Sequence, residues 1–268
     1  MSSTEKLREY GKDIEKLIIL RTAPVAVKVL KDESEIPEGS LRPKKDLNGH
    51  IALCQAFTLA RRQRLNITML KEDHWCFKPL IDYGLVEPPE SYLEGLTLYP
   101  FFISDKGAAA KRIKESMRLP LGKYIGLTCA PLERVNFDPD IILIYCNPGQ
   151  LRHLLLAIGY KSGYQVTSIF DPIGSCVHSV IPPLLTGECA ITVPDPGEYE
   201  RAIAGEDEII FSVPRKRLED LMLGLWHLEN SMRGYNRFTY LIRPDFPQPP
   251  FYQEYFRMWG LSGTREGN

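Results

Sequence analysis

The residues best suited to chemistry in this sequence are three of its six cysteines, Cys54, Cys76 and Cys176. Cys54 lies on a predicted helix, and Cys76 and Cys176 each lie where a predicted strand gives way to a helix. Free backbone N–H groups and the helix dipole at such turns lower the pKa of a thiol and favour the thiolate, which is the form that binds iron or zinc. Because ligand sites in open α/β sheets lie off the carboxyl ends of strands, we expect Cys76 and Cys176 to face one site.

Three thiolates without an obvious fourth are typical of a [4Fe–4S] cluster with one open iron. An open iron could polarise a hydroxyl or carbonyl as a Lewis acid, or the cluster could transfer electrons. Cys129, Cys146 and Cys189 are the remaining candidates for a fourth ligand, although the apolar strand before Cys146 favours a core position. The spacings of 22 and 100 residues match no zinc knuckle or ferredoxin run, so separate, unreactive core cysteines remain an alternative.

Two histidines and a lysine are the candidates for acid–base or electrostatic roles. His74 precedes Cys76 by two residues and His178 follows Cys176 by two, so each could be a ligand, a general acid or base, or a loop residue facing solvent. Lys28 interrupts an apolar strand pattern and could bind an anion if that strand is central, or face water at an edge. A further hypothesis is that Cys176 is a thiol nucleophile assisted by His178. The segment around Cys176 does not match the G-x-S-x-G motif of the nucleophile elbow, however.

The composition excludes several classes of protein. The chain has 268 residues, 33 basic and 34 acidic side chains and a net charge of −1, so no global basic field favours nucleic acid. Its apolar runs are far shorter than the ~20 residues of a membrane-spanning helix. The charged N-terminus lacks a secretion signal, which predicts a cytoplasmic protein. No G-x-G-x-x-G or Walker motif supports nucleotide binding, and the basic run Arg61–Arg64 predicts a solvated helix face.

Hydrophobic periodicity predicts alternating helices and strands. A first helix is expected to begin at Ser2, and later helices are expected over residues 50–64, 105–117, 150–160 and 215–232. The expected strands span residues 25–30, 65–70, 123–129, 141–145, 165–170, 190–193 and 208–213.

The two halves of the chain share an order of elements, which suggests a duplication. If the duplication is real, Cys76 and Cys176 are near symmetry mates and a site lies between the halves. The sequence therefore predicts an α/β protein with a mixed sheet, built as one compact domain over residues 1–268. Its predicted parts are similar strand–helix subdomains over 1–122 and 123–233 and a C-terminal arm rich in proline and aromatic residues over 234–268. A homodimer is also expected.

The chain resembles the domain-of-unknown-function family 169, the ArCR type, found in archaea and anaerobic bacteria. The motifs that carry the resemblance include Pro24–Lys28, Cys54–Ala56, Asn147–Gln150 and Gly174–Cys176. It covers roughly residues 15–224 and implies that Cys54, Cys76 and Cys176 are the family's recurrent cysteines. Occurrence in anaerobes fits an oxygen-sensitive cluster, and the family name assigns no activity.

From the residues and the resemblance we expect a [4Fe–4S] cluster bound by Cys54, Cys76 and Cys176 at the junction of the two halves. Its expected use is anaerobic metabolism of a small polar or aromatic molecule, by Lewis-acid dehydration or by electron exchange with a redox partner protein. A carrier that holds another metal or a tetrapyrrole is one alternative. A metal-free thiol hydrolase or transferase is another.

Overall fold

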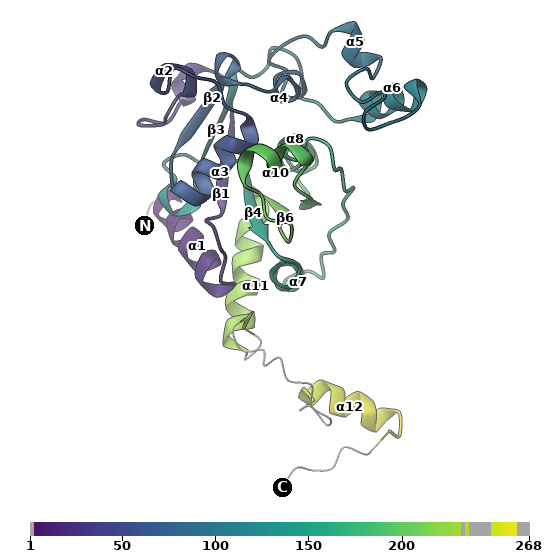
Figure 1. The fold of residues 1–268 in the computed structure, drawn as a ribbon. Coiled ribbons are helices and arrows are strands. Elements are labelled where there is room, and N and C mark those ends of the chain that lie inside the picture. Colours follow the sequence, from purple (N-terminus) through teal and green to yellow (C-terminus); the bar gives the residue numbers. More distant parts are fainter. Residues whose placement is uncertain (1–2, 232–233, 236–247, 262–268) are drawn as a thin grey trace. The chain divides into compact units, whose positions relative to one another are not determined.

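A six-stranded sheet with helices on both faces organises residues 1–236 (Figure 1). The computed structural model describes residues 3–231, 234–235 and 248–261. The strands are β1 (Val25–Leu30), β2 (Ile67–Leu70), β3 (Gly126–Pro131), β4 (Ile141–Cys146), β5 (Ala190–Thr192) and β6 (Ile209–Pro214). Their order in the sheet is β2-β3-β1-β4-β6-β5. The predicted α/β class is confirmed.

The strand order has an internal symmetry. The first three strands of the chain form the set β2-β3-β1 and the last three form the set β5-β6-β4, and the two sets meet where β1 pairs with β4. At this seam Val25 lies opposite Leu143 and Val27 lies opposite Ile141. β3 begins at Gly126, inside the predicted second subdomain 123–233, so the duplication and the division at residue 122 both stay predictions.

The pairing within the sheet differs in direction from the mixed sheet that we expected. All five pairings between these strands are antiparallel, and parallel pairing is confined to the isolated bridges Leu41–Ile67 and Ile51–His74. The strand predicted over residues 165–170 does not form. There the Ser168 hydroxyl accepts a hydrogen bond from Ile191 N (2.8 Å) and donates one to Ile191 O (2.6 Å). This side chain occupies the backbone groups of β5 that a neighbouring strand would need.

Eleven α-helices accompany the sheet in the described part of residues 1–236. They are α1 (Ser3–Leu17), α2 (Pro43–Asp46), α3 (Leu53–Gln63), α4 (Phe77–Asp82), α5 (Glu90–Leu93), α6 (Lys106–Glu115), α7 (Pro148–Gly159), α8 (Ser175–His178), α9 (Ile181–Thr186), α10 (Pro196–Ala202) and α11 (Leu218–Asn230). Short 3₁₀ turns span Glu33–Glu35, Lys71–Asp73, Leu132–Arg134 and Arg215–Arg217. No described helix is long and apolar enough to cross a membrane.

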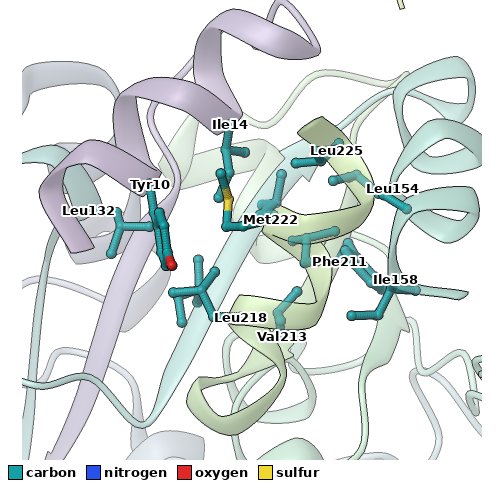
Figure 2. Packing of buried hydrophobic residues seen from close by; sticks show 14 of the residues in the cluster. Tyr10, Ile14, Leu132, Leu154, Ile158, Phe211, Val213, Leu218, Met222 and Leu225 are labelled. Atoms are coloured by element: carbon teal, nitrogen blue, oxygen red, sulfur yellow. The ribbon is translucent and has the colours of Figure 1, made fainter. Parts of the chain in front are cut away.

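Alternation along the strands divides the core between the two faces of the sheet. Ile142 and Ile144 of β4 face the core formed with α1, α7 and α11, in which Met222 of α11 packs near Ile14 of α1 (Figure 2). Leu143 and the other odd-numbered residues of β4 face the core formed with α3, α8 and α9. Because successive strand residues point to opposite faces, one uninterrupted apolar run supplies both cores.

Residues 237–268 form a separate unit. Its described helix, α12 (Pro250–Met258), begins after Pro249, and the rings of Tyr255 and Trp259 stack with centroids 5.7 Å apart. This helix lies within the predicted arm, whose boundary and role stay predictions.

Candidate functional site

The structure brings the three predicted cysteines to the wall of one cavity of about 240 Å³ on the α3 face of the sheet. We call it the thiol cavity, defined by Cys54, Cys76 and Cys176. Most of its wall is apolar and includes Leu53, Tyr92, Leu98, Phe102, Ile113 and Ile173. Three charged side chains also line it, namely Lys78, Asp195 and Arg201.

Each thiol is positioned by the start of a helix. Cys54 is the second residue of α3, whose first turn is closed where Ala52 N donates to Gln55 Oε1 (2.8 Å). Cys76 directly precedes α4. Cys176 is the second residue of α8, and its carbonyl oxygen accepts a hydrogen bond from Tyr83 Oη (3.0 Å). Tyr83 is fully buried, so it ties α8 to the end of α4.

Burial keeps two of these thiols neutral. It raises the pKa of Cys54 to about 12, and the negative charges of Glu198 and Asp195 act in the same direction. Burial also raises the pKa of Cys176 well above its ordinary value, with further contributions from Cys54 and Asp195. Cys76 is half-buried. The thiolates that we expected from the helix starts are therefore absent at Cys54 and Cys176 at neutral pH.

The prediction of a [4Fe–4S]-binding protein is wrong. Within residues 3–231, 234–235 and 248–261, no group of three or more His, Cys, Asp or Glu side chains could hold a metal ion. The three thiols share a cavity without forming a ligand set, and burial opposes the charged form that a cluster needs. The remaining candidates for a fourth ligand, Cys129, Cys146 and Cys189, are buried as well.

A buried acid network lies behind Cys176. Asp195 Oδ2 accepts hydrogen bonds from Gly174 N (3.0 Å), Ser175 N (2.9 Å) and Ser175 Oγ (3.2 Å). Glu198 accepts from Ser175 Oγ and from Tyr145 Oη (2.6 Å). Burial raises the pKa of Glu198 to about 7, although both hydroxyl donors lower it. This network was not predicted from the sequence. The local pattern that could have indicated it is Asp195 followed by Pro196, which is typical of the start of a helix.

Arg61 continues the network behind Tyr145. Its Cζ lies 4.0 Å from the centroid of the Tyr145 ring, and its two Nη atoms donate to Glu208 at 2.6 and 2.9 Å. Burial alone would raise the pKa of Glu208, but the hydrogen bonds from Arg61 hold it below its ordinary value. Arg61 is fully buried, so the predicted solvated face of Arg61–Arg64 is wrong at its first residue.

His178 lines a different pocket, of about 310 Å³, whose lining does not include Cys176. Its Nε2 is 2.5 Å from Oδ2 of the buried Asp171, which also pairs with Arg112. Burial would raise the pKa of Asp171, but His178 lowers it below its ordinary value. The catalytic role predicted for His178 stays a prediction at this second pocket.

The other two predicted acid–base residues do not line the thiol cavity. His74 is buried, neither ring nitrogen has a hydrogen-bond partner in the described chain, and burial lowers its pKa to about 4. Of the two alternatives for Lys28, the structure has the half-buried position on the interior strand β1, where its Nζ pairs with Glu35 Oε1 at 3.3 Å. Their predicted catalytic roles stay predictions.

Comparisons with known proteins agree with the resemblance read from the motifs. The model of the domain-of-unknown-function family 169, described as Uncharacterised ArCR, matches residues 13–224. An uncharacterised protein of Methanocaldococcus jannaschii, MJ0308, is 25% identical over 224 residues, which cover 83% of this chain and 94% of that protein. No solved structure matches the chain significantly. The chain belongs to the Uncharacterised ArCR family, domain of unknown function 169.

Proposed function

We propose that this chain binds a compact, mainly apolar small molecule in the thiol cavity. The observation that carries the proposal is a cavity of about 240 Å³ whose wall combines apolar side chains with three thiols. Small-molecule sites are typically concave and mostly apolar, with a few polar groups that fix orientation. An apolar cavity of about 150 Å³ is large enough for benzene, so this one suits a molecule with one or two rings.

The wall is built from elements that are tied together. Gln55 Nε2 donates to Arg201 O (3.2 Å) and Thr58 Oγ1 donates to Ala202 O (2.7 Å), so α3 and α10 are joined beside the cavity. On the other side, Tyr92 Oη donates to Asp82 Oδ1 (3.0 Å). A cavity held by such contacts is preformed, which lowers the entropy cost of binding.

Neutral aromatic probes test the proposal. Indole and 1-naphthamide should bind the full chain saturably, as followed by ligand-observed NMR and isothermal titration calorimetry. Thr97→Trp places an indole at a half-buried position of the cavity wall and should abolish binding of both probes. Leu96→Trp is the matched control, because Leu96 is exposed and lies outside the wall.

The two variants give a clear decision. Loss of binding in Thr97→Trp with retention in Leu96→Trp supports the thiol cavity as the site. Equal affinity in both variants, or no binding to the unmodified chain, overturns the proposal. Circular dichroism and thermal unfolding confirm that each variant folds.

A homodimer and a cytoplasmic location also belong to the proposal. Light scattering coupled to gel filtration gives the mass of the particle in solution, and a mass near 31 kDa would contradict a dimer of this 30.6-kDa chain. Fractionation of the source cells tests the location.

A further inference from the structure

Arg201 presents an unused hydrogen-bonding edge at the thiol cavity. Its Nη1 donates to the exposed Glu200 at 3.3 Å, and its Cζ lies 5.0 Å from the centroid of the exposed Trp75 ring. Its Nε is buried without a hydrogen-bond partner, and Nη2 has no acceptor among the described residues. A buried donor without an acceptor carries a desolvation cost that a ligand oxygen could recover.

Gly197 makes room for this guanidinium. A Cβ built on Gly197 would lie 2.0 Å from Arg201 Nη2 and 2.9 Å from Cζ. Gly197 is not among the residues with a positive φ, so its backbone conformation does not itself require glycine. The absence of a side chain at residue 197 therefore leaves the space that the Arg201 guanidinium occupies.

The other charged groups of the wall already have partners. Lys78 Nζ donates to the fully buried Asp82 at 2.8 Å, so the charge of this lysine is neutralised. Asp195 is the one acidic residue in the described wall, and both of its carboxylate oxygens accept hydrogen bonds from backbone N–H groups, Oδ1 from Glu198 N at 2.8 Å. Arg201 is thus the cation of the wall whose charge is least compensated, since Glu200 is exposed to solvent.

We infer that the natural ligand of the thiol cavity is a carboxylate with an apolar or aromatic body, and that Arg201 binds its carboxylate through Nε and Nη2. The fork of an arginine matches the two oxygens of a carboxylate, and such charge-assisted pairs are stronger than neutral hydrogen bonds. The apolar wall receives the remainder of the molecule. This inference rests on the proposed function, because it assigns the ligand class of the same cavity.

A pair of probes of equal shape isolates the role of charge. Calorimetric titration of the full chain with 1-naphthoate and 1-naphthamide should show tighter binding of the carboxylate. Arg201→Met should weaken the binding of 1-naphthoate by about 10- to 100-fold, which is the range expected for a lost hydrogen bond to a charged group. The same variant should change the affinity for 1-naphthamide little. Gly197→Ala keeps the charge of Arg201 but displaces its guanidinium, so it should weaken the binding of 1-naphthoate by a smaller factor. Arg134→Met, at an exposed position outside the wall, is the control.

The possible results distinguish the binding of a carboxylate by Arg201 from the more general binding of an apolar molecule in the thiol cavity. Binding of 1-naphthamide that equals binding of 1-naphthoate overturns the inference and leaves a site for neutral molecules. If Lys78→Met loses the binding of 1-naphthoate and Arg201→Met retains it, the anion binds at Lys78 and the assignment to Arg201 is overturned. Binding of neither probe overturns both claims.

Discussion

Replacement of Glu198 by glutamine should make the stability of this protein depend less on pH. Glu198 is fully buried and accepts hydrogen bonds from Ser175 Oγ and Tyr145 Oη. Burial raises the pKa of its carboxyl from an ordinary 4.5 to about 7. Glutamine has nearly the same shape and cannot ionise, so the variant removes the titration while retaining one acceptor and one donor group.

The sign and size of the effect follow from proton linkage. Between pH 4.5 and 7 the folded chain holds a proton on Glu198 that the unfolded chain has released, so the free energy of unfolding falls as pH rises. A difference of about 2.5 pKa units corresponds to about 3 kcal/mol, lost progressively until the folded-state carboxyl ionises above pH 7. Glu198→Gln should therefore gain about 3 kcal/mol relative to the natural chain between pH 4 and pH 8.

Urea unfolding, followed by circular dichroism at half-unit steps from pH 4 to pH 8, measures this difference directly. The two stability curves should diverge with a midpoint below pH 7. Glu219→Gln, at an exposed ion pair with Lys6, provides the control and should run nearly parallel to the natural chain. Tyr145→Phe removes a donor that lowers the pKa of Glu198, so it should move the divergence to higher pH.

Parallel curves for the natural chain and Glu198→Gln would refute the reasoning. They would mean that Glu198 has the same pKa in the folded and unfolded states, which its burial does not permit if the packing around Ser175 and Tyr145 is as described. A divergence of opposite sign would mean that the hydrogen bonds outweigh burial.

Two further predictions concern packing and thiol reactivity. Gly224→Ala would place a Cβ 1.9 Å from the carbonyl oxygen of Ala157, where α11 packs against α7, so urea unfolding should show a loss of about 1–3 kcal/mol or more. An unchanged free energy of unfolding would contradict that close packing. Peptide mapping after brief iodoacetamide treatment of the folded chain should find Cys76 modified before Cys54 and Cys176, because the latter two are buried and burial raises the pKa of each thiol. Faster modification of Cys176 would contradict the burial.

The elements with the strongest apolar patterns could be predicted from the sequence. The strand over 141–146 has six consecutive buried residues, and both of its faces contribute to a core. The segment 165–170 has a similar alternation, but Ser168 holds it to β5 through a side chain. Alternation reports which side chains are apolar and carries no information about which backbone groups remain free to pair. That information depends on residues more than twenty positions away.

The candidate site was predictable only in part, for the same reason. Cysteine is rare enough to attract attention, so Cys54, Cys76 and Cys176 could be selected from sequence and do line one cavity. Arg61 lies in a basic run that predicts a solvent-exposed helix face. Its burial depends on its pairing with Glu208, 147 positions away in the sequence. Arg201 and Glu198 lie on a short polar helix without any local sign of their role. Interactions between charged residues that are far apart in the sequence determine whether such side chains are buried.

The nature of the cavity depends on which of two effects controls its thiols. The start of a helix favours a thiolate by about 1 kcal/mol, an effect that the eleven-residue α3 can supply at Cys54. Burial raises the pKa of Cys54 from 9.0 to about 12, which corresponds to about 4 kcal/mol against the charged form. Burial therefore dominates, and the buried thiols contribute to the cavity as small apolar groups. A wall of that character does not attract a cation, whereas the guanidinium of Arg201, whose buried Nε has no acceptor among the described residues and whose ionic partner Glu200 is exposed, favours an anion.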